Sequence, residues 1–306
     1  MEENKIKDKE NEENEEENKE ENKEKYYEKA GGIIKRIFRD LKIEEGMGYK
    51  EIAERIEKEI YELNGNPAFP VNISCNEVAA HDTCDKNDER KICGIVKIDV
   101  GVHVDGYVAD FAVTYDFTNE NGKLLEASKE ALENAISKVR SGLRISELGK
   151  EIEYTIKKYG FKPIQNLGGH RLERFRLHCG EIPNYEVRSN ETLNEGDVIA
   201  IEPFSTNGVG FVKETNICKI YSIDELKPTR NAYAREFFKL LEERYKNLPF
   251  AERWVIKDQK DKIALIELIR NGSLKRHPVL KEKENGLVSQ FETTVIVEKD
   301  SGKVLI

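Results

Sequence analysis

The sequence predicts a mixed α/β (α+β) fold, with helices packed on antiparallel strands in two similar halves. Two stretches with apolar residues at helical spacing precede a pair of apolar segments that flank Asp105-Gly106, and two more such stretches follow that pair. Asp-Gly between apolar segments is the strongest short signal for a β-hairpin. The order of elements indicates internal pseudo-symmetry without visible sequence repetition.

The first 25 residues differ sharply in composition from the rest. They hold eleven Glu, one Asp and six Lys, which is a net charge of −6 out of −9 for all 306 residues. Such a segment buries too little apolar surface to offset the entropy lost on ordering, so we expect residues 1–25 to be disordered. Residues 26–306 carry the remaining −3 and are long enough for a large buried core.

Composition argues against several classes of protein. No apolar run reaches the roughly 18 residues needed to span a membrane, and no signal-peptide pattern occurs. The sequence shows no stripe of basic residues of the kind that would indicate nucleic-acid binding. The five cysteines form no Cys-x-x-Cys pair, so neither a thiolate zinc site nor a disulfide framework is indicated. We therefore expect a soluble cytoplasmic protein with free thiols.

The first helical region covers residues 26–64. Its apolar residues recur every three or four positions. Gly46 and Gly48 divide the region into two helices, and Asn64-Gly65 ends the second helix.

The second half repeats this arrangement. Residues 124–160 show the same helical spacing. Residues 226–279 are predicted as a helical insertion, because segments 231–246 and 259–272 are amphipathic. Strands are expected in the hairpin from Ile95 to Phe117 and at 163–167, 168–170, 175–179, 197–204, 211–221 and 287–306.

Two aspartates lie on one face of the predicted hairpin. With a two-residue turn at Asp105-Gly106, residues whose numbers sum to 211 face each other, so Asp99 lies opposite Ala112 and Asp110 opposite Gly101. The aspartates are then diagonal neighbours, roughly 7–8 Å apart at the backbone, which suits a metal pair about 3.5–4 Å apart. The alternative, exposed salt-bridge or turn residues, is disfavoured because the strands are apolar.

Three further polar residues stand in apolar or glycine-rich segments. His170 follows Gly168-Gly169, Glu202 follows an apolar strand, and Glu292 lies in QFETTVIV. Solvation explains such glutamates poorly, which leaves an ion pair or a metal ligand as the alternatives. Two Asp, two Glu and one His form an oxygen-rich set that suits two divalent ions of Mn, Fe, Co or Zn.

Six separated motifs resemble those of the type 2 methionine aminopeptidases of peptidase family M24, in that family's order. The motifs are NPAFPVNISCNEVAAH, KIDVG…HVDGYVAD, NLGGH, RLHCG, AIEPF and QFETTVIV. The resemblance covers about residues 26–306 and is to archaeal-like members, with the helical insertion as the mark of the second type. It implies the pita-bread fold, in which pseudo-twofold helices pack on a curved antiparallel sheet around a central dimetal cleft.

The resemblance also implies roles for individual residues. The two metal ions would be bound by Asp99, Asp110, His170, Glu202 and Glu292, with Asp110 and Glu292 bridging both. Substrate contact and proton handling would fall to His81 and His178, with Glu202 as the proton shuttle. The methionine side chain would be held by Phe69, Leu177 and His277.

The implied reaction removes the initiator methionine from nascent polypeptides when the second residue is small. A metal-bound hydroxide would attack the Met carbonyl. The implied partner is the N-terminal Met of nascent chains, with the ribosome as a further candidate. We expect no membrane partner, no sequence-specific nucleic acid and a monomer.

Some residues depart from the family pattern. Asp82-Thr83-Cys84 stands where the family usually has Tyr-Thr-Pro, Thr293 where it often has His, and His277 where Tyr is more frequent. These departures bear on substrate fit and leave the metal ligands intact. Two alternatives stay open, an X-Pro dipeptidase or aminopeptidase of the same fold and a non-catalytic pita-bread protein that binds peptide or RNA. A chaperone-like scaffold centred on the acidic tail is supported by composition alone.

Overall fold

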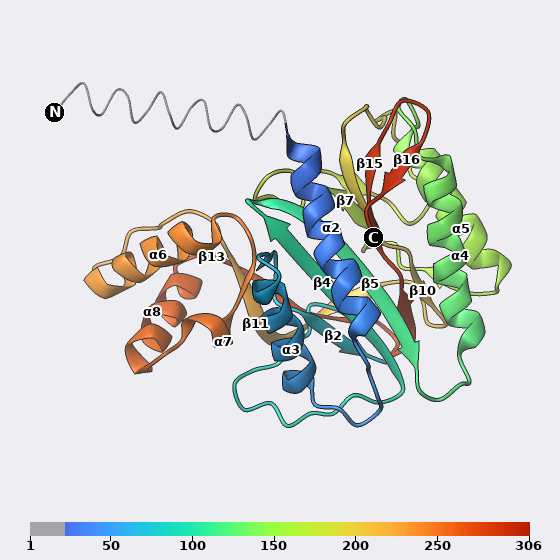
Figure 1. Cartoon of the computed structure of the whole chain (residues 1–306). Coiled ribbons are helices and arrows are strands. Elements are labelled where there is room, and N and C mark those ends of the chain that lie inside the picture. The colour runs from blue at the N-terminus through green and yellow to red at the C-terminus, as the bar shows by residue number, and fades with distance from the viewer. Residues whose placement is uncertain (1–21) are drawn as a thin grey trace, which may run out of the picture.

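A computed structural model describes residues 22–306 (Figure 1). The predicted disordered tail lies outside the described residues except for its end, where Lys23 already begins a helix. The helices are α2 (Lys23–Asp40), α3 (Tyr49–Glu62), α4 (Gly122–Lys138), α5 (Ile145–Lys158), α6 (Ala232–Tyr245), α7 (Glu252–Val255) and α8 (Gln259–Arg270). The strands are β1 (Asn66–Pro67), β2 (Asn72–Cys75), β3 (Val78–Ala80), β4 (Ile95–Val104), β5 (Tyr107–Asp116), β6 (Lys162–Pro163), β7 (Gly169–Arg171), β8 (Glu181–Ile182), β9 (Val198–Ile201), β10 (Phe204–Thr206), β11 (Val212–Ile223), β12 (Phe250–Ala251), β13 (Leu274–Glu282), β14 (Val288–Gln290), β15 (Thr293–Val297) and β16 (Gly302–Val304).

The first half places two helices over one face of a sheet. β4 pairs with β5 on one edge and with β1 and β2 on the other, and α2 and α3 cover the outer face (Figure 1). Ile34, Ile52, Val100 and Val102 are fully buried in the resulting core. Alternate side chains of a strand point to opposite faces, so Asp99 is left on the inner face.

The second half repeats this arrangement with different strands. The sheet order is β16-β15-β9-β7-β8, and α4 and α5 pack beside it (Figure 1). Leu148, Ile152, Ile199 and Val295 are fully buried between helices and sheet. Each half therefore has a helical pair outside and a strand face inside, as the sequence predicts.

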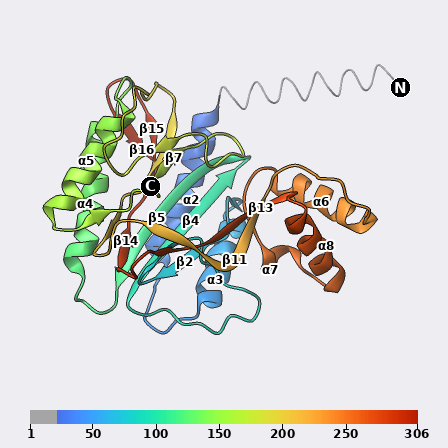
Figure 2. The ribbon, with the colours of Figure 1, turned by 180° about the vertical axis from the view of Figure 1, so that it is seen from behind.

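The helices α6, α7 and α8 lie to one side of the two halves (Figure 1). β11 and β13 form a long antiparallel pair that leads towards α6, α7 and α8 (Figure 2). α6 and α8 match the two amphipathic segments predicted from the sequence. Phe237, Phe238, Leu241 and Leu268 are buried between them. That this unit is an insertion into a two-halved fold stays a prediction.

The structure differs from the sequence prediction at residues 175–179, which do not form a strand. Phe175 has a positive φ of 56° and its N–H donates to the carbonyl of Gly106 (2.8 Å). A Cβ on Gly106 would lie 2.5 Å from the Phe175 ring. The segment at Phe175 therefore packs against the hairpin turn at Gly106 and does not pair with a strand.

Strand β13 (Leu274–Glu282) was not predicted, and its first residues fall within the segment 226–279 that was expected to be a helical insertion. Pro278 suggests a break in a strand, because proline has no N–H to donate to a neighbour. Here Pro278 faces Cys218 between two register shifts of β11, and such a bulge accommodates the missing donor.

A buried ion pair fastens α7 to α3. Both Glu57 oxygens accept hydrogen bonds from the Arg253 guanidinium, and one also accepts from Trp254 Nε1 (3.0 Å). The Glu57 and Arg253 side chains are only 8% and 6% exposed. The pair joins residues 196 positions apart.

Replacing Glu57 by alanine is therefore expected to destabilise the protein by about 3–5 kcal/mol, because it leaves the buried guanidinium unpaired. Urea denaturation measures the change. The control is Glu62→Ala, which breaks the exposed Lys58–Glu62 pair (3.4 Å) and should change stability by less than about 0.5 kcal/mol. A loss under about 1 kcal/mol for Glu57→Ala would contradict this account.

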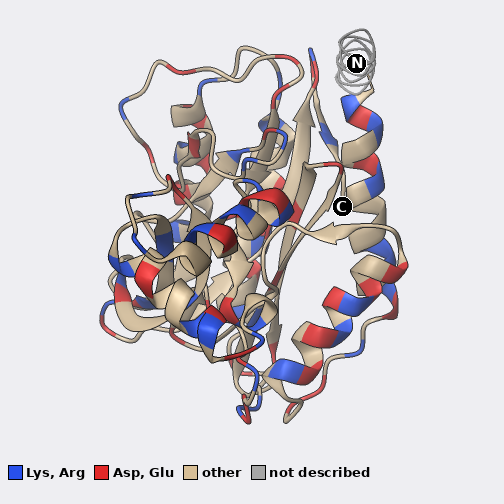
Figure 3. Cartoon of the chain, turned by 90° about the vertical axis from the view of Figure 1, so that its left-hand side faces the viewer, with Lys and Arg blue, Asp and Glu red and all other residues tan. Residues whose placement is uncertain are grey.

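Charged residues of both signs lie close together on the helices. Figure 3 shows acidic and basic residues interspersed along the helices of the face in view. Within residues 22–306, no helix combines the length and the apolarity required to cross a bilayer.

Candidate metal centre

The hairpin places two aspartates side by side, in the register that the sequence predicts. Asp99 on β4 faces Ala112, and Asp110 on β5 faces Gly101. The turn residues Asp105 and Gly106 both have positive φ, at 53° and 89°. Since a one-residue slip of β5 against β4 would put the two aspartates on opposite faces of the sheet, the Asp-Gly turn fixes the site.

Glu292 enters the site where the two halves of the molecule meet. It forms an isolated antiparallel bridge with Ala112, and its N–H donates to the Ala112 carbonyl (2.9 Å). Two residues on, the Thr294 hydroxyl accepts from the Asp110 N–H (2.7 Å) and donates to the Asp110 carbonyl (3.0 Å). These bonds hold β15 against β5, so Glu292 lies beside Asp110.

His170 and Glu202 come from neighbouring strands of the second half. His170 on β7 pairs with Ala200 on β9, and Glu202 follows that strand. A Cβ on Gly169 would lie 2.1 Å from the Ala200 carbonyl oxygen, so this approach requires glycine, as expected from Gly168-Gly169. His170 Nε2 lies 3.7 Å from Asp110 Oδ2 and 3.6 Å from Glu202 Oε1.

The five residues line one cavity of about 80 Å³. Ligand atoms of Asp110, His170 and Glu292 all lie within 4.8 Å of one another. Buried oxygens of Asp99, Asp110 and Glu292 have no hydrogen-bond partner among the described residues. Buried carboxylate oxygens need a cation or a donor, so this donor set fits divalent metal ions.

The pKa shifts of the clustered residues also indicate a site for a cation. Burial raises the pKa of Asp110 to about 7. Burial, together with the neighbouring carboxylates, raises the pKa of Asp99, Glu202 and Glu292 well above its usual value. Burial lowers the pKa of His170 to about 3, which keeps the imidazole neutral and able to bind a metal. Four carboxylates this close are unfavourable without a cation.

Gln290 is a site residue that sequence reasoning missed. Its Nε2 donates to Glu202 Oε2 (3.2 Å) and to Glu292 Oε2 (3.1 Å), so one amide orients both glutamates. The signal was its position in QFETTVIV, two residues before Glu292 and therefore on the same face of an extended segment.

His81 follows β3 with a strained backbone. Its φ is +63°, a conformation that costs a residue with a side chain roughly 1 kcal/mol or more. The ring Nδ1 donates to the Pro278 carbonyl (3.3 Å), and burial lowers the pKa of His81 to about 4. The neutral ring therefore presents Nε2 as a hydrogen-bond acceptor.

The residue after His81 explains how this strain persists. The Asp82 side chain is 6% exposed and pairs with Arg90 Nη1 (2.7 Å) and Lys219 Nζ (3.7 Å). The Asp82 carbonyl also accepts from Ile73 N–H (2.7 Å). Asp82, where the resemblance implies tyrosine, thus anchors the loop through an ion-pair network.

The other predicted residues divide between two cavities. Phe69, Leu177 and His277 line the carboxylate cavity, and that they hold a methionine side chain stays a prediction. His178 is exposed and lines an adjoining cavity of about 570 Å³, which it shares with His170. The two rings lie 4.5 Å apart between centroids. His178 is therefore beside the carboxylate cluster, on its open side.

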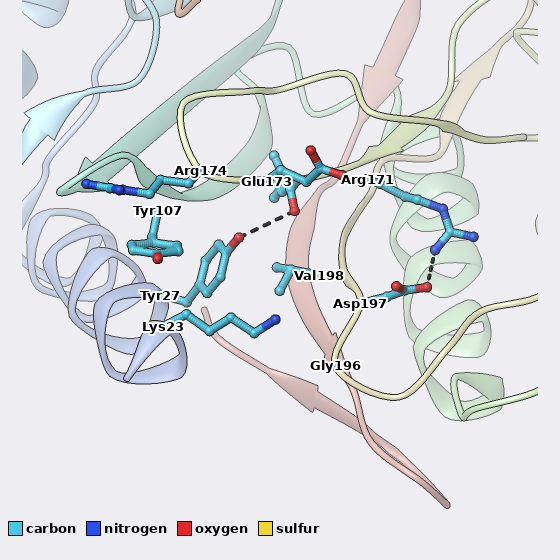
Figure 4. Close-up of a pocket in the computed structure, with 10 residues that line it drawn as sticks. Lys23, Tyr27, Tyr107, Arg171, Glu173, Arg174, Gly196, Asp197 and Val198 are labelled. Carbon is cyan, nitrogen blue, oxygen red and sulfur yellow. Dashed lines mark hydrogen bonds and ion pairs between the residues drawn. The ribbon is translucent and has the colours of Figure 1, made fainter. Parts of the chain in front are cut away.

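A further cavity, of about 210 Å³, lies between α2, the hairpin tip and the loop after β7 (Figure 4). No predicted site residue is among its described lining residues. Two of its cations are neutralised, since Arg171 pairs with Asp197 and Arg174 with Asp105 (3.1 Å). It lacks the unpaired carboxylates of the first cavity.

Comparison with known proteins places the sequence in a wider context. Residues 25–298 match metallopeptidase family M24. The chain is 50% identical to a methionine aminopeptidase of Archaeoglobus fulgidus, over 90% of this chain and 96% of that protein. It is 49% identical to a methionine aminopeptidase of Pyrococcus horikoshii, over 89% of this chain and 96% of that protein.

Solved structures show the same fold at lower identity. A thermophilic Arx1 has a TM-score of 0.78 at 18% identity, covering 92% of this chain and 90% of that chain. A methionine aminopeptidase from Thermotoga maritima has a TM-score of 0.65 at 21% identity, covering 92% and 93%. A prolidase from Pyrococcus furiosus has a TM-score of 0.59 at 19% identity, covering 92% and 62%. The predicted pita-bread fold is confirmed.

Proposed function

The chain belongs to metallopeptidase family M24 and, within it, to the methionine aminopeptidases, and from this premise we propose that its carboxylate cavity removes the N-terminal methionine of polypeptides. The observation that carries the proposal is the meeting of Asp99, Asp110, His170, Glu202 and Glu292 in one buried cavity. As in the sequence-based expectation, the substrates would be nascent chains with a small second residue.

The enzyme is metal-dependent, and we propose two ions of Mn, Fe, Co or Zn in this cavity. Asp110 and Glu292 would hold the ions from the two halves of the molecule, because the Thr294 hydrogen bonds keep these two residues side by side; that they bind both ions is what the family resemblance implies. When bound, the ions would lower the pKa of a water and polarise a carbonyl. Gln290 would keep both glutamates oriented.

Three side chains of the protein would handle protons and substrate. Glu202 is the proposed general base, at the cluster edge nearest His170 (3.6 Å). His81 offers an unprotonated Nε2, so it would accept a hydrogen bond from the amide N–H of the scissile bond. His178, on the open side, would donate to the carbonyl oxygen as negative charge develops there.

The cavity walls suit a linear thioether side chain. Phe69 and Leu177 are 8% and 5% exposed and supply apolar surface, while His277 closes the wall through a 2.8 Å hydrogen bond between Nε2 and the Ser222 hydroxyl. The larger adjoining cavity would hold the residues after methionine. A monomeric cytoplasmic enzyme that meets nascent chains at the ribosome remains our expectation.

A substrate comparison tests the proposal against its rivals. Metal-loaded protein should release methionine from Met-Ala-Ser and leave Ala-Pro peptides essentially uncleaved. Preferential cleavage next to proline would favour an X-Pro peptidase of the same fold. A failure to bind any divalent metal, measured by metal analysis of the purified protein, would instead favour a non-catalytic binding protein.

A further inference from the structure

A buried asparagine at the edge of the carboxylate cluster has an unused acceptor. Asn72 on β2 is 4% exposed and pairs in register with Asp99 on β4. Residues directly opposite on antiparallel strands place their side chains on the same face. Asn72 lines the same cavity as the carboxylates, and its Oδ1 has no hydrogen-bond partner among the described residues.

The hydrogen bonding fixes the orientation of the carboxamide. Nδ2 donates to the Pro70 carbonyl (2.8 Å), and a carbonyl oxygen can only accept, so the amide cannot be flipped. The free atom is therefore the acceptor Oδ1.

The neighbours of Asn72 offer it no donor. Asp99 and Asp110 are proposed metal ligands, and a carboxylate that binds a metal through its oxygens has no proton to donate; His81 donates its Nδ1 proton to Pro278. Phe69 and Ala80, which also line this cavity, are apolar. Buried acceptors are almost always satisfied, so the missing donor is expected from a bound molecule.

The order of the strands places Asn72 relative to the other residues of the cavity. β2, β4 and β5 are adjacent, and β5 meets β15 at the Ala112–Glu292 bridge. Asn72, Asp99, Asp110 and Glu292 therefore follow one another across the cavity. Glu202 follows β9, which pairs with β15 next to Glu292, so Asn72 lies at the end of the row opposite the proposed general base.

We propose that Asn72 Oδ1 accepts a hydrogen bond from the free α-amino group of the substrate. The inference rests on the proposed function and deepens it, because it assigns a subsite for the group that distinguishes an N-terminal residue from an internal one. Next to Asp99, a neutral acceptor binds the amine without adding a fifth carboxylate to the cluster. Substrates whose amino group is blocked or absent would lose this contact.

The test compares two competitive inhibitors that differ only in the amine, L-methioninamide and 4-(methylthio)butanamide. Inhibition constants are measured against Met-Ala-Ser cleavage for the metal-loaded wild-type protein and for Asn72→Leu, which has nearly the same shape. In wild type, L-methioninamide should bind more tightly. In Asn72→Leu this preference should fall roughly ten-fold, as expected for a hydrogen bond to a charged group, while the amine-free inhibitor binds within about two-fold of wild type.

Ser74→Ala is the matched control. Ser74 lies two residues along β2, is 2% exposed and also has an unpartnered buried oxygen, but it does not line the cavity. Its substitution should leave the preference unchanged. Asn72→Ser, smaller and still polar, serves as a second variant if leucine prevents folding, and it should show the same fall.

Equal weakening of both inhibitors in the Asn72 variants would overturn the inference, since Asn72 would then support the fold or the metal site. The proposed function is tested separately by the wild-type protein. If wild type releases methionine but the inhibitor preference does not depend on Asn72, only the inference falls. If wild type releases no methionine from Met-Ala-Ser, both the proposed function and the inference that rests on it are refuted.

Discussion

Glu202→Ala is expected to reduce kcat for Met-Ala-Ser cleavage by roughly 10²–10⁴-fold, the range attributed to a positioned general base. Glu202 follows the buried strand β9 and faces His170 Nε2 at 3.6 Å, and Gln290 holds its second oxygen at 3.2 Å. Alanine removes both the base and one proposed metal ligand. Initial-rate kinetics on the metal-loaded variant measures the loss.

Two further variants separate these roles. Glu202→Gln keeps the size and an oxygen but cannot accept a proton, so it should remain nearly as inactive as alanine while binding more metal. The control is Glu195→Ala, which removes an exposed glutamate in the turn before the same strand and should leave kcat within about two-fold. Near-normal turnover in Glu202→Ala would refute the assigned role.

In the metal-free protein, the stabilisation contributed by the four cluster carboxylates should decline as pH rises from about 4 through 7. Buried histidines such as His81 and His170, whose pKa is lowered, change stability in the opposite direction below about pH 6.5. Burial raises the pKa of Asp110 to about 7, and the pKa of Asp99, Glu202 and Glu292 is also raised. In the unfolded chain these groups titrate near 4, so the folded state binds more protons over this range. The stabilisation is therefore complete below about pH 4 and disappears as pH passes through the folded-state values.

Divalent metal should reverse this trend, because it replaces the protons as the neutralising charge. At pH 7.5 and a concentration 100 times the dissociation constant, each bound ion should stabilise the fold by about 2.7 kcal/mol. Urea denaturation with metal and with EDTA, between pH 5 and 8, measures both effects. Asp110→Asn should weaken the pH dependence and the response to metal. A pH dependence of stability that is the same in metal-free wild type and in Asp110→Asn would contradict this account.

The sequence predicts the parts of the site that depend on local geometry. The Asp-Gly turn and the two-residue period of strands suffice to place Asp99 and Asp110 together, and the observed register agrees. The Gly-Gly pair before His170 correctly indicates a close backbone approach. Helical spacing locates the main helices, since each buries one apolar face.

Other features depend on contacts between distant segments and could not be predicted. The bridge between Ala112 and Glu292 joins the two halves, and no local pattern encodes it. Asp82 was noted only as a departure from the family pattern, because one of its two partners, Lys219, is 137 residues away. The loop at Phe175 looked like a strand, since its apolar residues pack against a hairpin turn that lies far off in the sequence.

Metal reconstitution tests the central claim most directly. Metal-free protein is titrated with Mn, Fe, Co or Zn, and methionine release from Met-Ala-Ser is followed together with the number of ions bound. We predict that activity is absent without metal, returns with at least one of these ions at no more than two per chain, and is lost in Asp110→Asn. Methionine release that is unaffected by metal removal, or no release with any of the four ions, would contradict the account.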